Sequence, residues 1–281
     1  MNGFYIINKP KGMTSSQVVG KIKFLLGRKF KVGHMGTLDP LASGVLPIAV
    51  GRATRLFDFL LQKKKTYIAT FQFGYLTDTL DNTGTTLQET DKIPTFQELQ
   101  NILPKFLGVQ QQMPPQYSAK SVNGKRAYDL ARNGEYVELK PCKIEIFDIQ
   151  VLRQLDSRTF ELSITCSGGT YIRSIARDLG IALNSLGTMT NLIRTQSGMF
   201  KIADAMHLDD FDNDKILPMQ FVLKDYPVLN LTEMQLKTIL DGKKLILNDV
   251  ADNTYVVYYN DSIQCLCEVI DKVLKPTTWL R

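Results

Sequence analysis

The 281-residue sequence predicts an α+β protein with a large, mixed and mainly antiparallel central sheet. Two observations carry this prediction: several segments alternate apolar and polar residues, and others carry an apolar stripe at helical spacing. Strands and helices do not alternate regularly, as they would in a parallel βαβ fold. Hydrophobic residues make up 44% and charged residues 22%, a balance that supports a sizeable core.

The N-terminal part begins with an expected strand at 4–8. Ser15 or Ser16 is expected to cap the next helix, which Gly27 closes. The predicted buried stripe of this helix consists of Val18, Val19, Ile22, Leu25 and Leu26. A glycine-punctuated loop at 33–44 precedes an apolar run. In the segment TYIATFQFG, Tyr67 and every second residue after it share the face expected to be buried.

The middle of the chain adds a second helix, which Thr95 and Glu98 start as a capping box and Pro104 shortens or kinks. Residues 110–136 are polar and basic, and we expect them to leave the core as an insertion. A strand at 160–166 and a helix after it follow. Arg173 and Arg177 lie one turn apart beside the apolar stripe of that helix.

The character of the sequence changes near 223–227. A short helix near 232–240 and strands near 254–259 and 263–270 predict a small β-rich module. We therefore expect a large domain at 1–223, with its insertion at about 110–136, and a small module at 224–281.

Composition and motifs limit the metal sites, cofactors and cellular locations that the sequence supports. The four cysteines form no CxxC pair and only two histidines are present, so no metal site is expected. Neither a Walker A motif nor a GxGxxG turn after a strand occurs, which disfavours nucleotide and dinucleotide cofactors. We expect no cofactor. The sequence has no signal-peptide pattern and no membrane-length apolar stretch, so we expect a cytoplasmic protein without a membrane partner.

Charge is distributed unevenly along the chain. The net charge is +6, and residues 1–38 contain seven basic and no acidic side chains. The first carboxylate is Asp39. This pattern fits an ordinary solvated basic face, and it also fits a positive field that attracts a polyanion towards one carboxylate.

Asp39 lies in a loop suited to presenting a side chain. Gly33, Gly36 and Gly44 allow tight turns, and Pro40 drives Asp39 towards an extended conformation. An ordinary Asp-Pro turn has the same composition, so this fragment alone leaves both interpretations open.

The string GHMGTLDPLASGVLPIAVGRATRL resembles the signature of the TruB family of tRNA pseudouridine synthases. The resemblance continues in INKPKGMTS, KTYIATFQFG, TDTLDNTG, PPQYSAKSVNGKRAYDLAR and GGTYIRSIARDLG, and so covers nearly all of the first 200 residues. It implies the pseudouridine synthase fold with a thumb-like insertion, and a small PUA-like module at the C-terminus. It also implies a cofactor-free isomerase acting on uridine 55 in the T stem-loop of tRNA, with no obligatory protein partner.

The resemblance also implies residue roles. Asp39 matches the nucleophile that attacks the uracil ring or the ribose C1′. Tyr67 matches the residue that stacks on the base and is a candidate to take the C5 proton. Arg173 matches the residue that pairs with the nucleophile. His34 matches the residue that fills the space of the flipped nucleotide, and Tyr171 and Leu192 match pocket-lining positions. Candidate RNA contacts are Lys9, Lys11, Asp81, Lys120, Lys125, Arg126 and Arg132.

Two alternatives remain from the sequence. One is a guide-dependent relative acting on ribosomal RNA, although such proteins usually carry longer terminal extensions. The other is a non-catalytic tRNA-binding or tRNA-folding protein. The set Asp39, Tyr67 and Arg173 argues against the second, because binding alone needs no carboxylate facing a polyanion.

Overall fold

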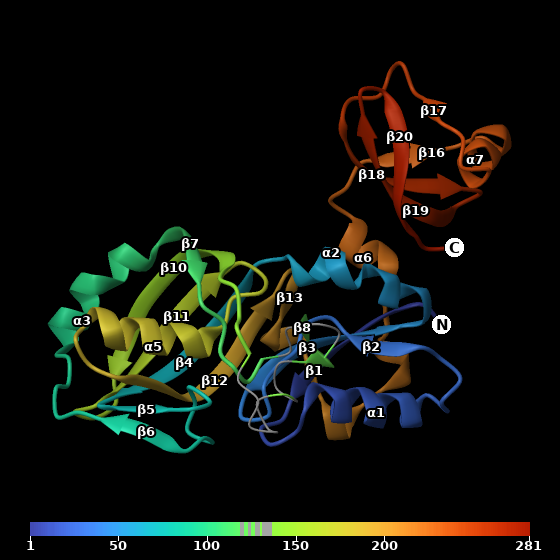
Figure 1. Cartoon of the computed structure of the whole chain (residues 1–281). Coiled ribbons are helices and arrows are strands. Elements are labelled where there is room, and N and C mark those ends of the chain that lie inside the picture. Colours follow the sequence, from blue (N-terminus) through green and yellow to red (C-terminus); the bar gives the residue numbers. More distant parts are fainter. Residues whose placement is uncertain (119–120, 123–124, 127–129, 131–136) are drawn as a thin grey trace.

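The computed structural model describes the chain except residues 119–120, 123–124, 127–129 and 131–136, and gives only the backbone of 121–122 and 125–126. Its largest element is an 11-stranded sheet, with a separate 5-stranded sheet formed by the C-terminal part (Figure 1). None of the helices in the described part of the chain has the length and apolarity needed to cross a membrane.

The long sheet has the order β14-β1-β3-β12-β4-β11-β10-β7, with β2 beside β3, β13 beside β12 and β15 beside β1. Only the pairs β1–β14 and β3–β12 are parallel, so the predicted mixed, mainly antiparallel sheet is confirmed. The strands are β1 (Gly3–Lys9), β2 (Val32–His34), β3 (Ser43–Val50), β4 (Lys65–Phe73), β7 (Gly108–Gln112), β10 (Cys142–Gln154), β11 (Thr159–Cys166), β12 (Gly187–Ser197), β13 (Phe200–Lys201), β14 (Met206–His207) and β15 (Leu217–Pro218).

Helices α1 (Ser15–Leu25), α3 (Phe96–Ile102) and α5 (Ile172–Ala182) pack on one face of this sheet (Figure 1). The period-2 pattern predicted for 66–74 is confirmed, because Tyr67, Ala69, Phe71 and Phe73 are all buried in this layer. The Thr95–Glu98 capping box is present, and η2 (Leu103–Phe106), which contains Pro104, replaces the α-helix after Ile102.

Three predictions about elements were wrong. Thr14, not Ser15 or Ser16, caps α1, because Thr14 and Gln17 form a reciprocal capping box. Leu25 is exposed rather than part of the buried stripe. The insertion also begins later than 110, because β7 pairs with β10 as the edge strand of the long sheet and buries Gln112. Two short ribbons, β5 (Tyr75–Thr77) with β6 (Thr86–Glu89) and β8 (Ser121–Val122) with β9 (Lys125–Arg126), complete this part.

The second sheet follows α6 (Met219–Leu223) and has the order β16-β18-β19-β20-β17. Its elements are β16 (Val228–Asn230), α7 (Glu233–Leu240), β17 (Leu245–Ile246), β18 (Asn253–Tyr259), β19 (Ser262–Ile270) and β20 (Val273–Trp279). One face encloses its own core with α7, in which Cys265 and Cys267 are buried together. The other face packs Val256 and Leu266 in one apolar cluster with η1 (Gly51–Leu56), α2 (Phe57–Leu61) and α6.

Candidate active site

The loop that carries Asp39 connects β2 to β3, and α1 holds its backbone through hydrogen bonds. Ser15 Oγ accepts a hydrogen bond from the Leu38 N–H at 2.9 Å and donates one to the Leu38 carbonyl at 3.0 Å. The Gly12 N–H donates to the Pro40 carbonyl at 2.7 Å, on the other side of Asp39. The backbone is thus fixed on both sides of a side chain that remains 32% exposed.

Gly44 closes this loop where β3 meets β12. Its φ of +106° lies in the left-handed region, and a Cβ there would stand 2.3 Å from the Arg194 carbonyl oxygen. Only glycine therefore allows β3 to approach β12 this closely. This contact places the Asp39 loop beside the side chains of β12.

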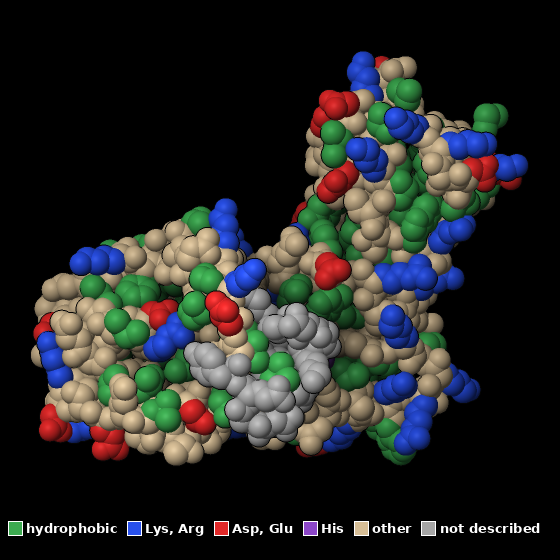
Figure 2. All heavy atoms as spheres, in the orientation of Figure 1, with side chains coloured by type: hydrophobic (Ala, Val, Ile, Leu, Met, Phe, Trp, Pro, Cys, Tyr) green, Lys and Arg blue, Asp and Glu red, His purple; other side chains and the backbone are tan. Residues whose placement is uncertain are grey.

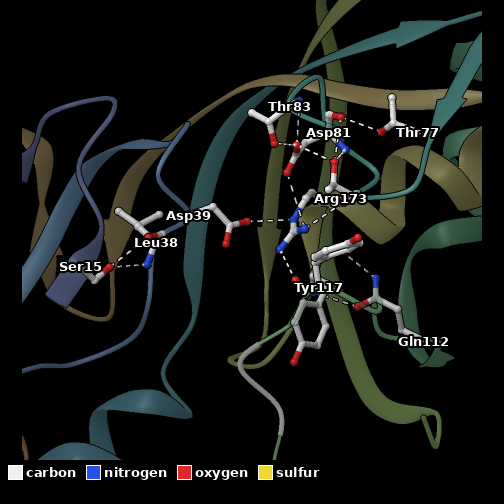
Figure 3. A network of polar contacts seen from close by, with 11 residues as sticks. Ser15, Leu38, Asp39, Thr77, Asp81, Thr83, Gln112, Tyr117 and Arg173 are labelled. Carbon is white, nitrogen blue, oxygen red and sulfur yellow. Dashed lines mark hydrogen bonds and ion pairs between the residues drawn. The ribbon is translucent and has the colours of Figure 1, made fainter. Parts of the chain in front are cut away.

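Arg173 lies in the first turn of α5 and points to Asp39 (Figure 3). Its Nε is 2.9 Å from Asp39 Oδ2. Its Nη1 donates to the Thr79 carbonyl and its Nη2 to the Tyr117 carbonyl, both at 2.9 Å. The guanidinium is 8% exposed and is therefore a buried charge whose donors are oriented by three separate segments.

Asp81 forms the back of this network. Its carboxylate lies 3.6 Å from Arg173 Nη1 and accepts hydrogen bonds from the Thr79 and Thr83 hydroxyls (Figure 3). The sequence had suggested an RNA contact at Asp81, and the structure contradicts this, because the side chain is buried and turned inward. The position instead supports the orientation of Arg173.

Tyr67 lies on β4 beneath the cavity. Burial raises the pKa of its phenol to about 12, and the positive charge of Arg194, the second-largest influence, only partly offsets this. Accepting the C5 proton as a phenolate would need the opposite shift, because a general base works best with a pKa near the operating pH. In this state Tyr67 is a neutral, buried phenol and not a ready base.

Arg194 is a site residue that the sequence had not indicated. It lies on β12, is 1% exposed, and is the cross-strand partner of Tyr67 in the pairing of β12 with β4. A signal was present, because residues two apart on a strand share a face and Leu192 was already expected in the pocket. Lys65, also buried at the cavity, and Gln112, which holds the Tyr171 backbone through two hydrogen bonds, were missed as well.

These side chains surround a cavity of about 360 Å³, a volume within the range of small-molecule sites. Asp39, Tyr67, Tyr171, Arg173, Leu192 and Arg194 all line it. Among the described residues, Asp39 is the only acid in the lining, and three cations accompany it, Lys65, Arg173 and Arg194. Burial lowers the pKa of Lys65 to about 8 and raises that of the Tyr171 phenol, which marks the enclosed character of the site.

Other predicted site residues lie elsewhere. His34 is half-buried on β2 opposite Ile48 and does not line the cavity. Lys9 was wrong as an RNA contact, because its side chain is buried and its Nζ donates to the Pro10 and Met13 carbonyls at 3.0 and 2.6 Å. Lys11 is exposed, with its Nζ 3.4 Å from Asn191 Oδ1.

The remaining predicted RNA contacts lie outside the side chains that the structure describes. Lys120 and Arg132 lie outside the described residues, and for Lys125 and Arg126 the structure gives the backbone of β9 alone. In the part of the chain that is described, no three His, Cys, Asp or Glu side chains gather where they could hold a metal ion.

Sequence comparison identifies both the class and the family of this protein. The model of the TruB family pseudouridylate synthase (N terminal domain) matches residues 23–172. The tRNA pseudouridine synthase B of Clostridium kluyveri is 41% identical over 267 residues, which cover 92% of each chain. That of Rickettsia felis is 42% identical over 257 residues, 88% of this chain and 76% of the relative. This chain therefore belongs to the TruB family.

Solved structures agree on the fold. A chain in the crystal structure of a Cbf5-Nop10-Gar1 complex superposes with a TM-score of 0.72 at 23% identity, covering 99% of this chain and 85% of that chain. A chain in the structure of an H/ACA RNP bound to a substrate RNA containing 2'-deoxyuridine gives a TM-score of 0.68 at 22% identity, with coverages of 99% and 84%. At this identity the likeness concerns the fold alone.

Proposed function

We propose that this protein isomerises uridine to pseudouridine in tRNA, at uridine 55 of the T loop, with Asp39 as nucleophile. In this reaction the C1′–N1 bond breaks, the uracil turns, and a C1′–C5 bond forms. Asp39 attacks either the uracil ring or the ribose C1′. The single observation that carries the proposal is the Asp39–Arg173 ion pair at a cavity in which Asp39 is the only acid among the described lining residues.

The enclosed position of the carboxylate supports base flipping. A stacked uridine hides its C5, C6 and C1′, so the nucleotide must leave the stack to reach a group at the cavity. The apolar and aromatic lining, including Tyr67, Tyr171 and Leu192, suits a planar base. His34, half-buried outside the lining, fits the proposed role of filling the space that the nucleotide leaves.

Charge supports an RNA substrate. Six of the seven basic residues before Asp39 are exposed, and Lys and Arg side chains gather on the side of the molecule that carries α1 (Figure 2). Such a surface attracts a phosphate backbone without reading its sequence. Lys11, Lys120, Lys125, Arg126 and Arg132 are the proposed RNA contacts, the last four from the insertion that closes over the T stem-loop.

Relatives support tRNA as the substrate class. The Clostridium kluyveri and Rickettsia felis proteins are named tRNA pseudouridine synthase B, and their identity with this chain exceeds 40% over most of its length. We further propose residues 1–223 as the catalytic domain and 224–281 as a PUA-like accessory module. The separate 5-stranded sheet beyond α6 supports this division.

The test uses the purified protein alone with an unmodified tRNA transcript, a transcript in which uridine 55 is cytidine, and the Asp39→Ala variant. Pseudouridine mapping is expected to show product at position 55 with the wild-type protein only. Product at another site would refute the position. Tight tRNA binding without product would support the non-catalytic alternative, and product from Asp39→Ala would refute the nucleophile.

A further inference from the structure

Arg194 is a buried cation whose partners differ from those of Arg173. No carboxylate of the described residues forms an ion pair with it, although burying an isolated charge is costly. Burial lowers the pKa of Arg194, but an arginine keeps its proton in proteins under ordinary conditions. A permanent positive charge therefore lies beneath the cavity, and other groups must compensate it.

Backbone carbonyls provide this compensation. Arg194 Nε donates to the Val45 carbonyl at 2.7 Å, Nη2 to the Gly36 carbonyl at 3.1 Å, and Nη1 to the Thr37 carbonyl at 3.3 Å. These three carbonyls belong to the two ends of the segment that carries Asp39. The guanidinium thus ties both ends of the Asp39 loop to β12.

The same guanidinium also lies at the cavity with the Tyr67 phenol. The two residues are cross-strand partners, and the positive charge of Arg194 opposes the rise that burial causes in the pKa of the phenol. One planar side chain therefore connects β4, β12 and the Asp39 loop. Gly44 fixes the distance between β3 and β12, because the absence of a side chain lets β3 lie directly against the Arg194 backbone.

We propose that Arg194 is a positioning residue for the isomerisation, which sets the Asp39 loop and the Tyr67 phenol relative to each other. This inference rests on the proposed function. The five donors of a guanidinium lie in a fixed plane and can bind several carbonyls in set directions at once. A lysine ammonium would keep the charge, but its three donors diverge from one nitrogen and cannot reproduce a planar fork on three nitrogens, so Arg194→Lys is the sharpest variant.

The experiment measures single-turnover pseudouridine formation and tRNA affinity for the wild-type protein, Arg194→Lys and Arg194→Met. A displacement of about 1 Å in a reacting group can cost about 100-fold in rate. We therefore expect Arg194→Met to lose about 100-fold in the rate constant and Arg194→Lys to recover part of this loss, with tRNA affinity within about twofold of the wild-type value.

A matched control separates positioning from general stability. Phe160→Leu alters a fully buried side chain of β11 that does not line the cavity, and it should lower the melting temperature with an unchanged rate constant. A double variant with Tyr67→Phe gives a second readout. If Arg194 acts partly through the phenol, the double variant should lose less in rate than the product of the fold-losses of Arg194→Lys and Tyr67→Phe.

The outcomes are separable. A wild-type protein without product refutes the proposed function itself. An active wild type with Arg194→Lys at the wild-type rate overturns this inference, even where Arg194→Met fails to fold. A rate loss matched by an equal loss of tRNA affinity, or one that Phe160→Leu reproduces at equal melting temperature, overturns it as well.

Discussion

The two sheets bury very different side chains. In the layers built on the long sheet, Arg194 on β12, Arg173 on α5 and Asp81 in the turn before β6 are buried among carbonyls and hydroxyls. The core of the C-terminal sheet consists of aliphatic, cysteine and aromatic side chains. Buried polar groups cost free energy unless they have hydrogen-bond partners. Their concentration in the part of the molecule built on the long sheet therefore marks where precise orientation of charge matters.

Within the long sheet, the network around Arg173 and the network around Arg194 also differ. Arg173 contacts carboxylates and carbonyls on three segments distant in sequence, one of them at Tyr117 where the chain enters the insertion. The hydrogen bonds that Arg194 donates within the described residues go to carbonyls at the two ends of the Asp39 segment. The first arrangement directs a charge at the Asp39 carboxylate, whereas the second holds the backbone of the loop that carries it.

Among the residues that support Asp39, the largest effect is expected for Arg173→Met. Loss of the guanidinium removes the counter-charge and the direction of the Asp39 carboxylate, and it leaves Asp81 buried without its ion-pair partner. We expect the rate constant of pseudouridine formation to fall by about 10²- to 10³-fold in single-turnover assays. A rate near the wild-type value would show that the ion pair is not used.

A smaller loss is expected for Asp81→Asn. The amide preserves the shape and the hydroxyl contacts but removes the charge 3.6 Å from Arg173. We expect a loss of about tenfold, equivalent to ~1.4 kcal/mol in the barrier, with tRNA affinity retained. The exposed Asp91, which pairs only loosely with Arg158, gives a matched control in Asp91→Asn, whose rate should not change.

Tyr67→Phe tests the burial of the phenol through the pH dependence of the free energy of unfolding. The folded pKa of about 12 lies above the unfolded value near 10, so the folded state favours the protonated form. This contribution is complete below about pH 10 and is lost as the pH rises to about 12. Chemical denaturation should show the wild-type protein losing about 3 kcal/mol more than Tyr67→Phe across this interval. Parallel pH curves would contradict the buried, neutral phenol.

The smallest effect on rate is expected in the C-terminal sheet. Val257→Ala opens a cavity in a core of aliphatic, cysteine and aromatic side chains and should lower the free energy of unfolding of this part by about 2 kcal/mol. The single-turnover rate constant should stay within about twofold of wild type under folded conditions. A loss as large as that of Asp81→Asn would remove the distinction between the two sheets.

Local patterns in the sequence predicted much of the long sheet. The alternation after Tyr67 and the Thr95–Glu98 capping box depend on residues close in the chain, and both were confirmed. The cap at Thr14 also had a local signal, the Thr-x-x-Gln spacing, which the two following serines obscured. The Asp39–Arg173 contact followed from the family resemblance and not from any local pattern.

Contacts that form only in the folded chain explain what the sequence missed. Arg194 is buried because carbonyls about 150 positions earlier satisfy its donors, and no local pattern encodes that pairing. Lys9 belongs to a basic run yet turns inward, because the Pro10 and Met13 carbonyls meet its ammonium. Composition predicts which residues carry charge, but the tertiary structure determines whether that charge meets solvent.

The most direct test of the account is the single-turnover rate of pseudouridine formation by Asp39→Asn, measured beside its tRNA affinity. The amide keeps the shape of a side chain that is one-third exposed but cannot act as a carboxylate nucleophile. We expect tRNA binding within about tenfold of wild type and no product above background. Product formation at the wild-type rate would contradict the assignment of Asp39.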